Sequence, residues 1–284
     1  MHYMTTFQPG NSTLTWSAGG LAGASMSSSD SLLQTGEKSQ VPALRWRRHW
    51  RGAQCQNRTI GLIDGDPGTD LDGEVCVRRF TNACDAQACE HARYSVALLR
   101  GHTRSSGRAH GARLKVAAVV GDDGTARPAA VAAAITWLID CNVEAIAIPL
   151  GQAARCPAVS DAMTQAAKAG MPVFCAAGNS YPQEVLFPAA HADAIAVGAL
   201  RPGYGLMDSC CRLPRLDLVV PSWRVPATDA SGQCLRRSGS SVACVIAAAA
   251  AAHAIAAGDL APRASRATVL RTLASSRRNH PPVP

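Results

Sequence analysis

The sequence has few aromatic and few charged residues. Aromatic residues make up 5% of the 284 residues and charged residues 17%, whereas hydrophobic residues make up 47%. Such a composition predicts a chain that buries a core, because disordered segments combine low hydrophobicity with high charge. The chain also lacks a run of the roughly 18 apolar residues that a membrane helix requires. Its longest alanine run, at 247–252, is much shorter, so we expect no membrane partner.

Acidic residues are the scarcer charged class. The chain has 28 Lys and Arg against 20 Asp and Glu, a net charge of +8. Four arginines lie in the segment Arg45–Arg51, and Arg277 and Arg278 lie near the C-terminus. No helix-turn-helix, zinc-finger or RNA-binding aromatic signature accompanies that segment, so we expect a solvated surface and no nucleic-acid partner. An anionic peptide or protein partner is also compatible with this charge.

Cysteine is common, and its odd count leaves at least one thiol without an intramolecular partner. There are eleven cysteines. Cys76, Cys84, Cys89 and His91 do not follow a standard zinc-ligand spacing, so we expect no metal and no other cofactor. The N-terminal segment lacks the basic and apolar regions of a secretory signal. Together these features favour a cytoplasmic protein.

The chain divides by composition into three parts. Residues 1–57 are predicted to be a flexible arm, 58–276 a folded domain and 277–284 a tail. Apolar strands alternate with helices through the middle part, which predicts an α/β fold: a mostly parallel sheet with helices on both faces. The expected strands are 59–64, 114–120, 143–150, 171–177, 194–200 and 216–220. The expected helices are 90–100, 128–140, 157–169, a long one after Ser241 and 263–276.

A Gly-Ser-Ser turn precedes the longest apolar helix of the sequence. Gly239, Ser240 and Ser241 lead directly into a segment rich in alanine. A hydroxyl at a helix N-terminus lies beside unpaired N–H groups that stabilise developing negative charge, as a nucleophilic serine requires. A helix N-cap is the other interpretation of a serine at this position.

Seven segments, in order, resemble the catalytic domain of the subtilisin-like serine proteases (subtilases) over roughly residues 58–276. They are 60–65 (IGLIDG), 107–114 with 116–119, 145–151 (AIAIPLG), 170–179 (GMPVFCAAGN), 187–190 with 194–199, 216–221 (LDLVVP) and 239–243 (GSSVA). The resemblance implies the subtilisin-like three-layer fold and hydrolysis of peptide bonds in a peptide or protein substrate.

The resemblance also assigns roles to individual residues. Ser241 matches the nucleophile, Asp64 the residue that orients the histidine, and Asn179 the side-chain donor of the oxyanion hole. The histidine motif of the family is only partly present. His91 matches its first histidine and is expected to be the general base, with His102 and His110 as competitors.

The resemblance places the substrate-binding wall beside these residues. Its members would be Leu150, Gly151, Ala176, Ala177 and Gly178. These small residues predict an open slot. Pro149 replaces a serine of the family motif, and because proline has no N–H, a backbone hydrogen bond to an extended substrate is expected to be missing.

Three functional interpretations follow. The first is a serine endopeptidase, similar to intracellular subtilases or to the compact subtilases that mature ribosomally made peptides, which would cut a peptide precursor. The second is a degenerate subtilase fold that binds or scaffolds a partner. The third is a nucleotide-binding α/β domain. The sequence lacks the two glycine-rich phosphate-binding motifs of such domains, G-x-G-x-x-G and G-x-x-x-x-G-K-[ST]. The sequence does not predict an oligomeric state.

Overall fold

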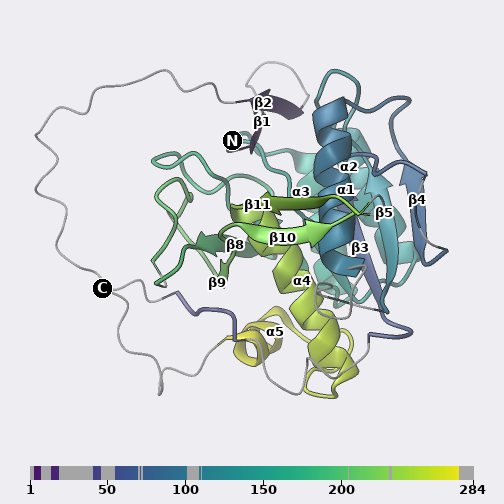
Figure 1. Cartoon of the computed structure of the whole chain (residues 1–284). Coiled ribbons are helices and arrows are strands. Elements are labelled where there is room, and N and C mark those ends of the chain that lie inside the picture. The colour runs from purple at the N-terminus through teal and green to yellow at the C-terminus, as the bar shows by residue number, and fades with distance from the viewer. Residues whose placement is uncertain are drawn as a thin grey trace, which may run out of the picture.

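The centre of the molecule is a parallel sheet of seven strands (Figure 1). The computed structural model describes residues 3–7, 14–18, 41–45, 55–69, 71, 73–100, 109, 111–203, 205–229 and 232–274. The strand order is β4-β5-β3-β6-β7-β8-β9, and every neighbouring pair is parallel. The strands are β3 (Thr59–Asp64), β4 (Val75–Arg79), β5 (Arg113–Ala118), β6 (Ala145–Ile148), β7 (Val173–Ala176), β8 (Ile195–Leu200) and β9 (Leu218–Pro221).

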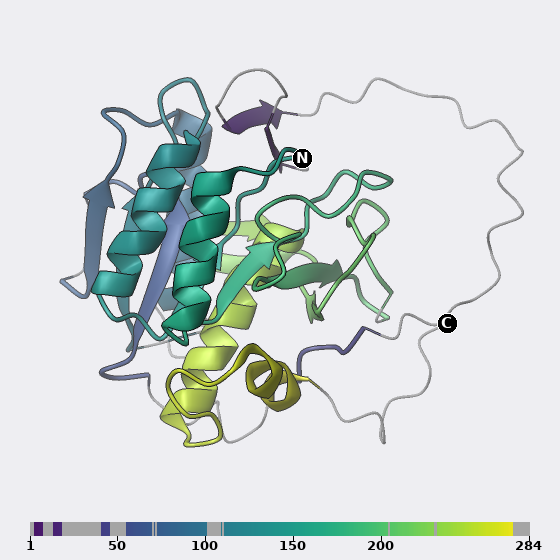
Figure 2. The ribbon, with the colours of Figure 1, turned by 180° about the vertical axis from the view of Figure 1, so that it is seen from behind.

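Helices cover both faces of this sheet. Helices α1 (Ala86–Arg100) and α4 (Ser240–Ala256) lie on one face, and α2 (Pro128–Asp140) and α3 (Pro157–Lys168) lie on the other, as Figure 2 shows from behind. A proline occupies the first turn of both α2 and α3, where its missing N–H costs no helical hydrogen bond. The arrangement confirms the expected α/β three-layer fold. No helix among the described residues is both long and apolar enough to cross a bilayer.

Helix α4 is buried on nearly all sides. All of its side chains from Val242 to Ile255 are buried. A helix that is apolar all round is expected in the interior of a domain. The small alanine side chains of 247–252 pack in one core cluster with residues of α1 and of the sheet.

The structure adds elements that the sequence pattern did not predict. They are the edge strand β4, the hairpin of β10 (Val225–Thr228) and β11 (Cys234–Arg237), and the paired strands β1 (Tyr3–Phe7) and β2 (Leu14–Ala18). Strand β4 is half exposed, so it lacks the continuous apolar run that marked the central strands. Helix α5 (Arg266–Leu273) is shorter than expected at both ends.

The sheet also pairs with a short segment from the range expected to be an arm. Leu44 N–H donates to the Val219 carbonyl at 2.8 Å, and Val219 N–H donates to the Pro42 carbonyl at 3.0 Å. Cys55 lies fully buried in the core. Folded structure therefore begins before residue 58, while the division at residue 57 stays a prediction. Most of Arg45–Arg51 and the whole of 277–284 lie outside the described residues.

Candidate active site

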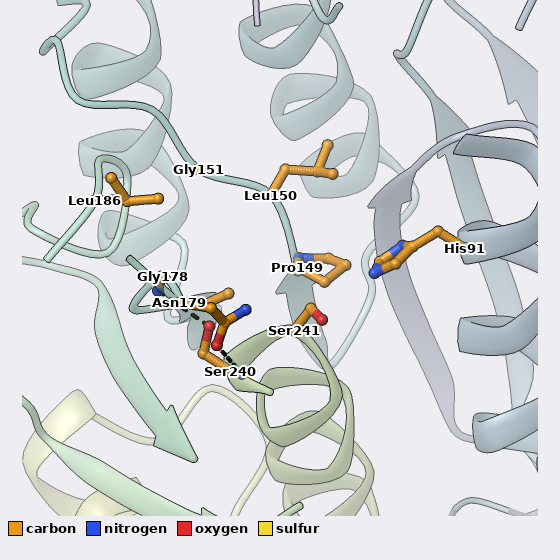
Figure 3. Close-up of a pocket in the computed structure, with 10 residues that line it drawn as sticks. His91, Pro149, Leu150, Gly151, Gly178, Asn179, Leu186, Ser240 and Ser241 are labelled. Atoms are coloured by element: carbon orange, nitrogen blue, oxygen red, sulfur yellow. Dashed lines mark hydrogen bonds between the residues drawn. The ribbon is translucent and has the colours of Figure 1, made fainter. Parts of the chain in front are cut away.

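The candidate site lies where the strand order of the sheet reverses. After β3 the chain forms β4 and β5 on one side of β3, and then crosses to β6 on the other side. Ligands of such sheets bind beyond the carboxyl ends of the strands at this switch point. Asp64 is the last residue of β3, Gly151 follows β6, and Asn179 follows β7. The N-terminus of α4, with Ser241, meets Gly151 and Asn179 around one pocket, which His91 also lines (Figure 3).

Asp64 and His91 are in direct contact inside the protein. The Nδ1 atom of His91 lies 2.8 Å from Oδ1 and 2.9 Å from Oδ2 of Asp64, which is fully buried. Gly65 N–H donates to Oδ1 at 2.8 Å, and the Ser95 hydroxyl donates to Oδ2 at 2.8 Å. The carboxylate is an acceptor only, so the His91 nitrogen that faces it carries the proton. The other ring nitrogen, Nε2, is then the atom that can accept a proton when the imidazole is neutral.

The local sequence explains why His91 reaches Asp64. A Cβ on Gly65 would lie 2.4 Å from the carbonyl oxygen of Ala88, so the turn after β3 approaches α1 more closely than any other residue allows. Helix α1 starts at Ala86, four residues before the expected start. His91 and Ser95 are four residues apart in α1, so they lie one turn apart on the same helix face. His102 and His110 lie outside the described residues.

Ser241 is the second residue of α4, and its side chain is half-buried beside the pocket. The N-cap is Gly239, with φ +126°, so Ser241 does not take the N-cap position. The hydroxyl of the neighbouring Ser240 accepts a hydrogen bond from Gly178 N–H at 3.0 Å. Cys244, one turn further along α4, is fully buried, and burial raises its pKa well above the ordinary value. Ser241 is therefore the accessible nucleophilic side chain at this helix end.

Asn179 presents its amide to the same space. Its Oδ1 accepts a hydrogen bond from Ser240 N–H at 2.9 Å, which fixes the amide orientation because a backbone N–H can only donate. Figure 3 shows the Nδ2 atom on the side that faces Ser241. The Ser241 N–H belongs to the first helical turn, whose N–H groups have no intrahelical acceptor. The two groups can donate together to a negatively charged oxygen.

The structure places four of the five residues expected in the substrate-binding wall around this pocket. Leu150, Gly151, Ala176 and Gly178 line the pocket. Ala177 does not: its side chain is fully buried in the core on the other face of the sheet. Side chains alternate along an extended segment, so Ala176 and Ala177 cannot face the same side. Ala177 reaches the wall only through its carbonyl, which accepts from Leu186 N–H.

Two further findings concern the pocket and its surroundings. Leu186, which the sequence interpretation did not assign to the wall, lies at the end of the pocket away from His91 (Figure 3). Pro149 also lines the pocket, where we expected a backbone hydrogen bond to an extended substrate to be missing. Within the described residues, no group of three His, Cys, Asp or Glu side chains is arranged to hold a metal ion.

A sequence comparison decides the family. The model of the subtilase family matches residues 82–282, which is more than half of the chain. The chain belongs to the subtilase family. Asp64 lies before the matched residues, so its contact with His91 comes from the structure and not from that match.

Individual relatives of this subtilase are distant. The major intracellular serine protease of Bacillus subtilis (strain 168) is 27% identical over 128 residues, which are 43% of this chain and 40% of that protein. Subtilisin BL of Lederbergia lenta is 27% identical over 153 residues, 54% of this chain and 57% of that protein. The subtilase thus spans about half the length of the curated relatives it matches.

A solved structure shares the fold. It is a serine-to-alanine mutant of the protease domain of PatA, with a TM-score of 0.64 and 17% sequence identity, covering 73% of this chain and 82% of that one. At this identity the likeness confirms the subtilisin-like fold alone.

Ser95 is a site residue that the sequence interpretation missed. We expect Ser95→Ala to lower kcat of this subtilase about tenfold and to leave KM unchanged. The reason is that Asp64 loses a donor. A tenfold loss is about 1.4 kcal/mol, near the lower end of the range for one hydrogen bond to a charged group. Ser95→Thr keeps the hydroxyl and is expected to restore most of kcat. The measurement is steady-state hydrolysis of a peptide substrate.

A matched control for Ser95 is Ser222→Ala. Ser222 is also fully buried, but its hydroxyl donates to the Val220 carbonyl and not to Asp64. It is expected to change stability without a selective loss of kcat. Equal kcat values for Ser95→Ala and the parent enzyme would show that Ser95 does not position Asp64.

Proposed function

We propose that this subtilase is a serine endopeptidase that works through Asp64, His91 and Ser241. The observation that supports this proposal best is the buried contact between Asp64 and Nδ1 of His91. Ser241 and Asn179 line the same pocket as His91. A nucleophile, a base oriented by a third group, and donors for an oxyanion are the parts that acyl transfer requires.

The proposed reaction has two halves. His91 Nε2 takes the proton of the Ser241 hydroxyl as its oxygen attacks the peptide carbonyl, and the negative oxygen accepts hydrogen bonds from Asn179 Nδ2 and Ser241 N–H. His91 then donates the proton to the leaving amine, which leaves an acyl group on Ser241. Water attacks that ester with His91 again as base, which releases the acid and restores the serine. Asp64 stays ionised and stabilises the imidazolium.

The substrate we propose is a peptide precursor in the cytoplasm. The sequence supports a precursor substrate because Ile63-Asp64-Gly65 resembles the same segment of the compact maturation subtilases. All eleven cysteines of the chain are free thiols in the structure, which suits a reducing compartment. A gene for a small precursor peptide beside the gene of this protein is expected, and its absence would count against precursor processing.

The test of the proposed activity is labelling with a fluorophosphonate probe. The probe reacts with an activated serine and not with an ordinary hydroxyl. We expect the parent protein to label and Ser241→Ala not to label, with Ser240→Ala as the matched control because Ser240 is the adjacent hydroxyl. A folded parent protein that does not label would contradict the proposal. It would favour the alternative of a catalytically degenerate binding module, which the replacement of a family serine by Pro149 supports.

A further inference from the structure

Leu186 fills the space between two glycines on the pocket wall. A Cβ on Gly178 would lie 2.8 Å from Cγ of Leu186, and a Cβ on Gly151 would lie 2.9 Å from its Cβ. Side chains at either position would therefore collide with Leu186. The two glycines leave the room that the leucine occupies, and Leu186 is only 7% exposed.

The backbone around Leu186 is tied to both walls. Leu186 N–H donates to the Ala177 carbonyl at 2.9 Å. The next residue, Phe187, exchanges two hydrogen bonds of 2.7 Å with Gln152, which follows Gly151. These bonds connect the segment to both the β6 and the β7 sides of the pocket. The backbone that carries Leu186 is therefore fixed on both sides of the pocket, and the side chain is packed between the two glycines.

The position of Leu186 tells which substrate residue meets it. His91 must protonate the leaving amine, so the leaving half of the substrate lies toward His91. In Figure 3, Leu186 and Gly178 lie at the opposite end of the pocket, with Asn179 and Ser241 between. That end belongs to the acyl half. One substrate residue supplies the carbonyl of the bond that is cut. The side chain of that residue enters the space bounded by Leu186.

The space that remains is small and uncharged. Leu186 packs against Gly151 and Gly178 at this end of the pocket, where the other lining side chain is Ala176. Apart from His91, none of the described residues that line it carries an ionisable side chain. We infer that Leu186 restricts this subtilase to cleavage after glycine, alanine or serine. This inference deepens the proposed peptidase function and rests on it.

The experiment compares peptide p-nitroanilides that differ only in the residue before the anilide: alanine, leucine or phenylalanine. We expect the parent enzyme to hydrolyse the alanine substrate with a kcat/KM at least about tenfold higher than the other two, since one methylene in a pocket changes discrimination about 10- to 200-fold. In Leu186→Ala the enlarged pocket is expected to remove or reverse this preference. Leu186→Val is expected to lie between them.

The control variant is Leu213→Ala, another leucine truncation. Leu213 is 56% exposed and lies outside the pocket, so its substrate preference is expected to match that of the parent. Equal cleavage after alanine and phenylalanine by the parent enzyme would overturn the inference. So would an unchanged preference in Leu186→Ala and Leu186→Val.

Fluorophosphonate labelling separates this failure from failure of the proposed function. A labelled parent enzyme that prefers leucine or phenylalanine is a peptidase with a different pocket, which contradicts only the Leu186 inference. A folded parent protein that neither labels nor hydrolyses any of the three substrates contradicts the peptidase function, and the inference falls with it. Should Leu186→Ala not fold, the substrate ratios of the parent and of Leu186→Val decide.

Discussion

Replacing Ser241 or His91 by alanine is expected to lower kcat for peptide hydrolysis about 10⁴-fold or more. Ser241 supplies the oxygen that forms the acyl-enzyme, and His91 is the buried imidazole that Asp64 orients at 2.8 Å. Neither side chain can act on the peptide bond without the other, so the double variant is expected to be no slower than either single one. The measurement is kcat for a peptide substrate under saturating conditions, for both single variants and the double variant.

The comparison of single and double variants distinguishes a catalytic unit from two independent residues. Independent contributions would multiply, whereas residues of one mechanism show a loss that is already complete in each single variant. Thermal unfolding of the three variants serves as the control for folding. A His91→Ala variant that keeps kcat within about tenfold of the parent would contradict the role of His91 as general base.

Replacing Asn179 is expected to have the next largest effect. Asn179→Ala removes a donor to the oxyanion, and loss of one such donor costs about 10²–10³-fold in kcat. The interaction forms as charge develops in the transition state, so KM is expected to change little. Steady-state kinetics with one peptide substrate measures both values.

The aspartate variant of Asn179 separates the chemical from the structural role. Asn179 also accepts a hydrogen bond from Ser240 N–H at 2.9 Å, and an aspartate retains an oxygen for that bond. Asn179→Asp replaces the Nδ2 donor by a second oxygen and adds a negative charge. We expect it to lose at least as much kcat as Asn179→Ala. Recovery of activity in Asn179→Asp would mean that Asn179 acts only by holding the first turn of α4.

The central strands and the order of the site segments could be predicted from the sequence. Buried parallel strands are continuous apolar runs, and β3, β7 and β8 each overlap a predicted range. The sequence also predicted His91 as the general base, although the helix that carries His91 begins at Ala86 and not at Glu90. The boundary was missed because the first turn of α1 carries little apolar pattern. Ser95 could have been found, since it lies four residues after His91 on a helix.

The shape of the pocket could not be predicted in the same way. Leu186 lies in an irregular segment between β7 and β8, and its place depends on the pairing of Phe187 with Gln152. No periodicity marks such a pairing, so the small residues of the wall pointed to an open slot. The placement of Ala177 away from the pocket has a different reason. The alternation of side chains after β7 indicates that Ala176 and Ala177 face opposite sides.

The alanine run of α4 has a consequence for the entropy of the site. A buried alanine loses no rotamer freedom on folding, whereas a buried leucine loses about 0.5–1 kcal/mol. The residues 247–252 therefore bring α4 into the core with no side-chain entropy cost, and they offer no alternative rotamers once packed. Along this stretch, the fit of α4 against its neighbours is set by the backbone and by methyl groups alone. The hydroxyl of Ser241 is thus carried by a helix whose middle turns have a single side-chain arrangement.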